Sequence, residues 1–113
     1  MYPFWYNYSI TIIRTLPIFD AWLSGIKDSL TQIRLGRRLD KAKRGLLGGV
    51  EPVGEGVFEM REHFDPGWRM YYVQRDTELI IMLGGGDKSS QPFDIVKAKH
   101  LADILENWFW RKK

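Results

Sequence analysis

The stretch VFEMREHFDPGWRMYYVQRDTELIIML, residues 57–83, decides the fold of this chain. Side chains in Val57–Phe64 alternate between two faces, which is the period of a β-strand. Asp65–Gly67 reads DPG, a strong turn signal, and Trp68–Arg75 returns as a second strand. Leu79–Leu83 is apolar throughout, which predicts an internal strand covered on both faces. The stretch therefore predicts three consecutive strands, the first two forming a hairpin.

The polar face of this hairpin is the most informative feature of the sequence. If Phe64 and Trp68 pair across the turn, His63 lies opposite Arg69, Arg61 opposite Tyr71 and Glu59 opposite Val73. Five side chains then share one face: Glu59, Arg61, His63, Arg69 and Tyr71. Such a set can supply a base, an acid and phosphate-binding cations. The alternative interpretation is a solvated face with cross-strand ion pairs.

Two helices are predicted before the hairpin. Residues 10–15 read as a short strand, Thr15 can cap the helix that follows, and Pro17 suits its first turn. Helical spacing places four apolar residues on one face of this helix: Phe19, Trp22, Leu23 and Ile26. Asp28 or Ser29 caps the second helix, whose apolar side carries Leu35, Leu39, Ala42 and Leu46. We expect the two helices to form an antiparallel hairpin.

The second helix carries most of the clustered positive charge. The net charge of the chain is +3 and its pI is near 9.3, yet residues 34–44 hold six basic residues and one acid. Helical spacing places four of the cations opposite the apolar side: Arg34, Arg37, Lys41 and Arg44. Clustered basicity points to an anionic partner, nucleic acid rather than membrane. An ordinary solvent-facing helix surface is the other possibility.

Glycine and proline divide the remaining chain. Residues 45–56 are rich in glycine, which predicts the end of the helix and an irregular connection, and Gly84–Gly86 predicts the end of the third strand. A last helix begins at Ser90 or Gln91, with Pro92 in its first turn and an inward face of Ile95, Ala98, Ala102, Leu105 and Phe109. The predicted order is β-α-α-β-β-β-α, an α/β (α+β) fold. It forms one domain over residues 10–113, preceded by an aromatic extension at residues 1–9.

Composition excludes several classes of protein. The 113 residues contain no cysteine, which removes disulfides and thiolate metal sites and suits a reducing cytoplasm. The longest apolar run is too short to span a membrane. Gly84–Ser89 is similar to a phosphate-binding loop, but Asp87 stands where that pattern needs glycine before the lysine. The two histidines, His63 and His100, share no metal-binding spacing, so we expect neither metal nor cofactor.

An ordered run of short motifs then gives the chain a resemblance. The run comprises Arg38-Leu39, Pro52-Val53-Gly54, Glu59-Met60-Arg61, Gly67-Trp68-Arg69 and, most specific, Gly85-Gly86-Asp87-Lys88-Ser89-Ser90-Gln91 with Asp94-Ile95. From Ile10 to Ala102 the chain resembles the "addiction module killer protein" branch of the RelE/ParE toxin superfamily, the HigB-like toxins of bacterial toxin–antitoxin pairs. The resemblance implies two N-terminal helices and a C-terminal helix around a twisted, mostly antiparallel sheet.

The resemblance also implies an activity. RelE-like toxins cleave messenger RNA, commonly on the ribosome, by driving the 2′-hydroxyl onto the adjacent phosphate, and ParE-like toxins inhibit DNA gyrase without being nucleases. A cognate antitoxin neutralises either kind. By position, Arg61 and Arg69 match the sheet cations of the branch, Lys88 matches the lysine before its last helix, and Glu59 is the carboxylate of the same motif.

The leading prediction is therefore a cytoplasmic toxin that cleaves mRNA without a metal. Arg61, Arg69 and Lys88 stabilise phosphate charge, Glu59 or His63 accepts the proton, and Tyr71 or His63 orients the leaving oxygen. Tyr71 and the helix cations Arg34, Arg37, Lys41 and Arg44 bind substrate. A ParE-like gyrase inhibitor is the alternative, and an inert toxin remnant is a third. The chain departs from the branch at Glu51, where a basic residue is expected; Glu51 weakens the positive groove or serves as a carboxylate base.

Overall fold

A computed structural model of the chain describes residues 11–76 and 78–110. In order, the described elements are β1 (Ile12–Thr15), α1 (Pro17–Ser24), α2 (Ser29–Lys43), β2 (Val50–Gly54), β3 (Val57–Glu62), β4 (Trp68–Arg75), β5 (Leu79–Asp87), a 3₁₀ turn (Lys88–Ser90), α3 (Gln91–Leu105) and a π-helical turn (Glu106–Trp110). The fold is α+β, as predicted. The extension at residues 1–9 and the side chains of Phe109 and Trp110 lie outside the described part.

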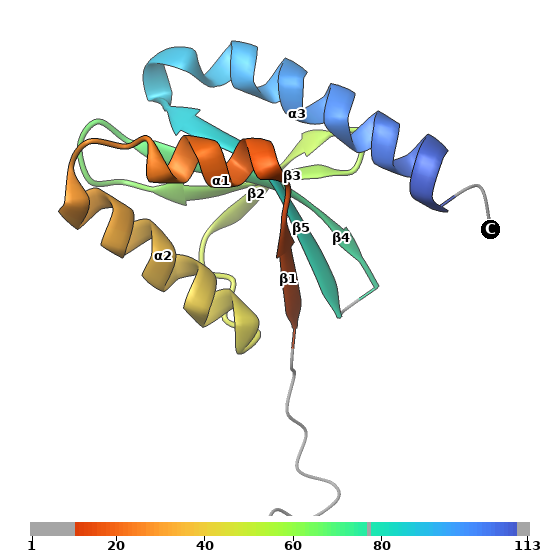
Figure 1. Cartoon of the computed structure of the whole chain (residues 1–113), viewed down its shortest axis with the longest axis horizontal. Coiled ribbons are helices and arrows are strands. Elements are labelled where there is room, and N and C mark those ends of the chain that lie inside the picture. The colour runs from red at the N-terminus through yellow and green to blue at the C-terminus, as the bar shows by residue number, and fades with distance from the viewer. Residues whose placement is uncertain (1–10, 77, 111–113) are drawn as a thin grey trace, which may run out of the picture.

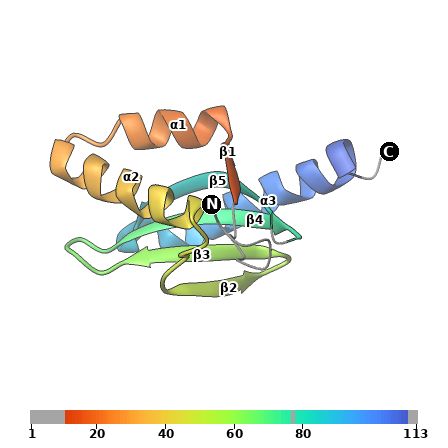
Figure 2. The same ribbon diagram turned by 90° about the horizontal axis from the view of Figure 1, so that it is seen from below.

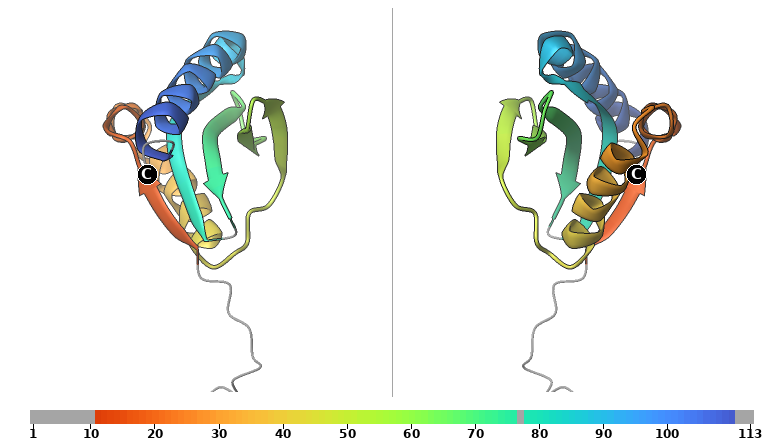
Figure 3. Two further views of the ribbon diagram at one scale, coloured as in Figure 1. Left: turned by 90° about the vertical axis from the view of Figure 1, so that its right-hand side faces the viewer. Right: turned by 90° about the vertical axis from the view of Figure 1, so that its left-hand side faces the viewer.

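The strands form one mixed sheet in the order β1-β5-β4-β3-β2. Only the pairing of β1 with β5 is parallel among these neighbours; the other three pairings are antiparallel. Figure 3 shows the sheet from β1 at one edge to β2 at the other, with a pronounced twist. Hairpins explain the antiparallel part, because β2 to β5 follow one another with short connections. β5 is an internal strand, as its apolar sequence predicted.

The alternation along β3 and β4 divides the core between two faces of the sheet. Met60, Met70 and Tyr72 pack with buried residues of α1 and α2, such as Phe19 and Leu35. The other face packs against α3 through a second cluster, which comprises Val57, Tyr71, Val73, Leu83, Ala98, Ala102 and Leu105. Figure 2 shows α1 and α2 stacked over the sheet, and Figure 1 shows α3 running along its other side. The sheet is therefore covered by helices on both faces.

The prediction that Gly84–Gly86 ends the third strand is wrong. β5 continues through all three glycines to Asp87, and these residues pair with β4 from Tyr71 to Arg69. A Cβ atom at Gly85 would overlap the ring of Trp22, and one at Gly86 would overlap the carboxylate of Asp94. The glycines let α1 and α3 approach the two faces of the sheet, so close packing replaces the break that composition suggested.

The connection over residues 45–56 is also more regular than predicted. Val50–Gly54 forms the edge strand β2, with Glu51 opposite Glu59 and a register shift between Pro52 and Gly54. An edge position tolerates Pro52, because its missing N–H is not needed on the open side. The observed order has one more strand than the sequence predicted.

The β3–β4 register differs from the expected one by two residues. Arg61 lies opposite Arg69, and Glu59 opposite Tyr71; the pairs of His63 with Arg69 and of Arg61 with Tyr71 are wrong. Strand pairing ends at Glu62 and Trp68, so the connecting loop has five residues rather than three. A shift of two keeps every side chain on its predicted face. The hairpin therefore keeps its polar face but changes its partners.

The helices begin and end close to their predicted limits. Asp28 caps α2 by accepting from the Thr31 N–H, whereas α1 has Leu16 in the capping position instead of Thr15, and no side-chain cap. Leu46 lies beyond the end of α2 and is exposed, so its placement on the apolar side of that helix was wrong. Within the described ranges, no helix is both long and apolar enough to cross a membrane.

Candidate active site

Glu59 is the centre of the polar cluster. It lies on β3, has no exposed surface, and is on the face of the sheet that α3 covers, since its neighbour Met60 packs under α1 and α2. A buried carboxylate needs ionic or hydrogen-bonding partners, because desolvation without them is costly. Those partners come from β3, β4 and α3.

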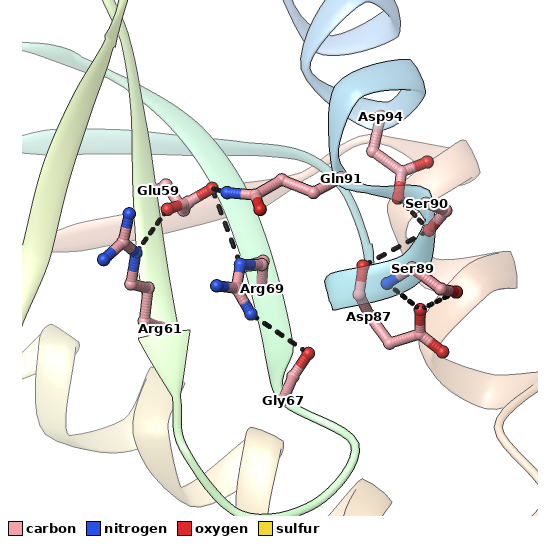
Figure 4. Close-up of polar contacts among 9 residues, drawn as sticks. All are labelled: Glu59, Arg61, Gly67, Arg69, Asp87, Ser89, Ser90, Gln91 and Asp94. Atoms are coloured by element: carbon pink, nitrogen blue, oxygen red, sulfur yellow. Dashed lines mark hydrogen bonds and ion pairs between the residues drawn. The ribbon is translucent and has the colours of Figure 1, made fainter.

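Three side chains surround this carboxylate (Figure 4). Arg61 Nε donates to Glu59 Oε2 at 2.6 Å, and Gln91 Nε2 donates to Glu59 Oε1 at 2.8 Å. Arg69 Nε lies 3.9 Å from the same Oε1, an ion pair without a hydrogen bond. The structure therefore brings together Glu59, Arg61 and Arg69 as predicted, with Gln91 as an addition.

The two guanidiniums lie directly opposite one another on neighbouring strands. Like charges in this position repel, and the one buried carboxylate between them does not balance both. Arg61 is 37% exposed at its side chain, and Arg69 is 12% exposed with Nη1 donating to the Gly67 carbonyl at 3.2 Å. Figure 4 shows the terminal nitrogens of Arg61 pointing away from Glu59. The cluster is suited to an additional anion at its open side.

Electrostatics follow from this arrangement. The hydrogen bond and charge of Glu59 raise the pKa of Arg61, and Glu51 raises it further. Glu51 is exposed on β2 opposite Glu59, so a second carboxylate approaches Arg61 from the solvent side. The cluster thus contains one buried and one accessible carboxylate.

Tyr71 lies in the cluster but has no exposed surface. Its hydroxyl makes no hydrogen bond to the described residues. Burial, followed by the charges of Glu59 and Asp94, raises the pKa of Tyr71 well above its usual 10.0. The phenol is therefore a neutral group beneath the surface rather than an exposed contact.

Lys88 joins the open side from the end of β5. Asp87 pairs with Trp68, which brings Lys88 beside Gly67, and Lys88 is exposed in the 3₁₀ turn before α3. Asp87 accepts from the Ser89 hydroxyl and backbone N–H, and these bonds lower its pKa. The turn fixes the backbone from which Lys88 projects.

The prediction that His63 lies in the polar cluster is wrong. It lies in the loop after β3 and is exposed, and the register leaves it without a position opposite Arg69. The predicted position of His63 assumed that the alternation of side chains continues to residue 63, but β3 ends at Glu62.

The predicted cations are all exposed: Arg34, Arg37 and Lys41 lie on α2, and Arg44 is the residue that caps its end. A cleft of about 310 Å³ lies between this helix and the β3–β4 loop, with Arg34, Arg37, Lys41, Glu62 and Phe64 among its lining residues. The Arg34 guanidinium stacks 4.6 Å from the Phe64 ring centroid. The α2 cations therefore lie on the face of the sheet that α1 and α2 cover, whereas the Glu59 cluster lies on the face that α3 covers.

Two side chains that hydrogen-bond between separate elements, Arg38 and Gln91, were not predicted from the sequence. Arg38 is buried and donates to the carbonyls of Leu47, Gly49 and Arg61 and to the Glu62 carboxylate. A signal for Arg38 existed, because position 38 lies on the side of Leu35 and Ala42. Gln91 had none, since its partner Glu59 is 32 positions away in the chain.

Comparison with known proteins finds a relative of the chain. An uncharacterized protein of Haemophilus influenzae is 38% identical over 93 residues, covering 82% of this chain and 94% of the Haemophilus protein. The chain belongs to the family of this Haemophilus protein. No protein-family model matches the chain, and no solved structure matches it. The name of the Haemophilus relative states no activity.

Proposed function

We propose that the protein is a RelE-like toxin that cleaves messenger RNA and is neutralised by a cognate antitoxin. The observation that carries the proposal is the pair of guanidiniums, Arg61 and Arg69, held opposite one another by the buried Glu59. A purely structural ion pair needs one cation for one carboxylate. Arg61, Arg69 and the nearby Lys88 outnumber the two carboxylates of the cluster, Glu59 and Glu51, and this surplus favours a ligand with concentrated negative charge, such as a backbone phosphate.

The reaction is an attack of the 2′-hydroxyl oxygen on the adjacent phosphorus. The new 2′ O–P bond forms as the 5′ O–P bond breaks, leaving a 2′,3′-cyclic phosphate and a 5′-hydroxyl end. Arg61, Arg69 and Lys88 stabilise the charge that develops on the phosphate oxygens. Preorganised cations of this kind act most strongly when other contacts already fix them, and Glu59 and the Gly67 carbonyl do so here.

Glu51 is our preferred proton acceptor. Glu59 was a candidate from sequence, but its two oxygens accept from Arg61 and Gln91 and it has no exposed surface. Glu51 is exposed beside Arg61, and a base must come within hydrogen-bond reach of the hydroxyl it deprotonates. His63, exposed in the neighbouring loop, is the second candidate for the base or the leaving-group acid.

Exposed cations on α2 complete the proposed RNA surface. Arg34, Arg37, Lys41 and Arg44 bind phosphates outside the reacting one, which adds affinity without selecting the cleaved bond. The ribosome is the proposed setting, since RelE-like toxins commonly act there.

Primer extension on RNA from induced cells, and on purified translating ribosomes, tests the function. We expect discrete cleavage sites with the wild-type protein, far weaker ones with Arg69→Ala, and fewer with Glu51→Gln than with His63→Gln. Growth arrest with intact RNA in both preparations would overturn the nuclease. Inhibition of supercoiling by purified gyrase would then identify the ParE-like alternative, and harmless expression without antitoxin would indicate an inert remnant.

A further inference from the structure

Gln91 is the side chain through which α3 reaches the Glu59 cluster. It is the first residue of the helix, and its amide donates to Glu59 Oε1 at 2.8 Å across the space between α3 and β3. Figure 4 shows the side chain extended toward the carboxylate, on the side opposite Arg61. The contact joins a helix to a strand that is distant in sequence.

The oxygen that Gln91 occupies is the one nearest to Arg69. Arg69 Nε lies 3.9 Å from Oε1, beyond hydrogen-bond distance, and it is buried without an acceptor among the described residues. A bond between a guanidinium and a carboxylate is stronger than one between an amide and a carboxylate. The weaker donor therefore hydrogen-bonds the oxygen, while Nε of the stronger donor has no hydrogen bond to the described residues.

We propose that Gln91 is a positioning residue that prevents Arg69 from closing a hydrogen-bonded ion pair with Glu59. By drawing Oε1 toward α3, Gln91 holds the carboxylate away from Arg69 Nε, which keeps its donors for another anion. The value of this displacement for catalysis rests on the proposed function, in which Arg69 binds the reacting phosphate. The geometric part does not, since it concerns only Gln91, Glu59 and Arg69.

A structural tie between α3 and the sheet is the competing explanation. α3 is already held against the sheet by Ala98, Ala102 and Leu105 in the core. Gln91 is thus a minor part of the attachment. If Gln91 served only to attach α3 to the sheet, removing its side chain would leave Arg69 in the same position.

Two variants separate these explanations. Gln91→Ala removes the side chain. Gln91→Met removes the amide but keeps the length of the side chain, so it tests the same point if alanine disturbs the packing of α3. Gln74→Ala is the matched control, because Gln74 is half-buried on β4 and has no contact with Glu59. Thermal unfolding establishes that each variant is folded.

The first measurement is the Nε–Hε signal of Arg69 in ¹⁵N–¹H NMR spectra, assigned by its loss in Arg69→Lys. We expect this proton to shift downfield and exchange more slowly with water in both Gln91 variants, because Nε then bonds to Glu59 Oε1. The control should leave the signal unchanged. This measurement needs no RNA and no activity.

The second measurement is single-turnover cleavage with a separate measurement of RNA affinity. We expect cleavage to slow about 10- to 100-fold in both Gln91 variants, the scale of a misplaced reacting group, with RNA affinity within about twofold of wild type. An unmoved Arg69 signal would overturn the proposal, and so would a moved signal with unchanged cleavage. If the wild type cleaves no RNA, the proposed function fails, and the NMR signal alone decides the geometry.

Discussion

At the scale of single residues, Glu59 explains why the polar cluster is so compact. Its carboxylate has no exposed surface, and a buried charge is stable only when strong donors surround it. Arg61 and Gln91 meet that need with hydrogen bonds, and Arg69 contributes charge at 3.9 Å. Glu59 thereby fixes the position of cations that would otherwise move freely in solvent.

Arg69→Ala should reduce the rate of RNA cleavage by roughly 10²–10³, the cost of losing one preorganised electrostatic donor. RNA affinity should fall much less, because binding is distributed over other cations. Single-turnover cleavage measures the first effect and filter binding the second. Arg75→Ala, at the opposite end of β4, is the matched control. A folded Arg69→Ala protein that arrests growth at wild-type potency would remove Arg69 from the mechanism.

Tyr71→Phe should change the free energy of unfolding at pH 7 by less than about 1 kcal/mol, because removing a buried hydroxyl without a partner costs little. At high pH the variant should be the more stable protein. The pKa of Tyr71 is raised in the fold, so its stabilising effect is complete below about pH 10 and declines as the pH rises above that value.

Denaturant unfolding of Tyr71→Phe and wild type at pH 7 and pH 10.5 measures both effects. A loss of more than about 2 kcal/mol at pH 7 would instead mean that the hydroxyl makes a bond important to the fold.

At the scale of elements, β5 and α2 show how helices are fitted to the sheet. β5 presents glycine where Trp22 of α1 and Asp94 of α3 approach it, and α2 is joined to the following loop and β3 by Arg38. Both devices act between elements that are separate in sequence. The glycines of β5 and the hydrogen bonds of Arg38 thereby help to position β5 and β3, the strands beside and within the Glu59 cluster.

Gly85→Ala should destabilise the protein by about 1–3 kcal/mol, the usual cost of overpacking, because the new methyl group meets the Trp22 ring. Gly84→Ala is the matched control on the same strand. A Cβ atom at Gly84 meets nothing within 4 Å, so we expect a change within about 0.5 kcal/mol. Chemical denaturation of both variants provides the comparison. Equal destabilisation would contradict the close packing of α1 on β5.

Arg38→Met should destabilise the protein by about 2–4 kcal/mol, since it removes the donor shared by three carbonyls and leaves Glu62 without its cation. Arg37→Met, one position earlier and exposed, should cost less than about 0.5 kcal/mol. Thermal and denaturant unfolding distinguish the two. Similar values for both would show that Arg38 is an ordinary surface cation.

At the scale of the whole molecule, charge is concentrated at one end of the sheet. The α2 cations border a cleft that reaches Glu62 and Phe64 of the β3–β4 hairpin, and Arg69 follows on the other side of that loop. The chain carries a net charge of only +3, but several of its exposed cations lie together at this end. A charged surface of this kind binds and steers polyanions.

Lys41→Ala should weaken binding of single-stranded RNA and lower the slope of log affinity against log salt by about 0.7, the value for one lost phosphate contact. Lys97→Ala is the control, since Lys97 lies on α3 over the Phe93 ring, away from α2. Fluorescence anisotropy over a range of salt concentrations gives both slopes. Identical slopes for the two variants would place RNA elsewhere on the molecule.

Local patterns determined most of the elements. Alternation and the DPG turn predicted β3 and β4, helical spacing predicted α1, α2 and α3, and the α2 cations are exposed as expected. The same alternation placed Glu59, Arg61, Arg69 and Tyr71 on one face. Such features depend on neighbours within a few positions, so the sequence by itself suffices for them.

Tertiary structure alone decided the rest. The two-residue change of register leaves every face unchanged, so no local pattern could reveal that Arg61 faces Arg69. β5 continues through Gly84–Gly86 because Trp22 and Asp94 occupy the space that side chains would fill, and Gln91 meets Glu59 because α3 packs across β3. Each of these depends on contacts between distant segments, whose geometry is set by packing and not by the period of the chain.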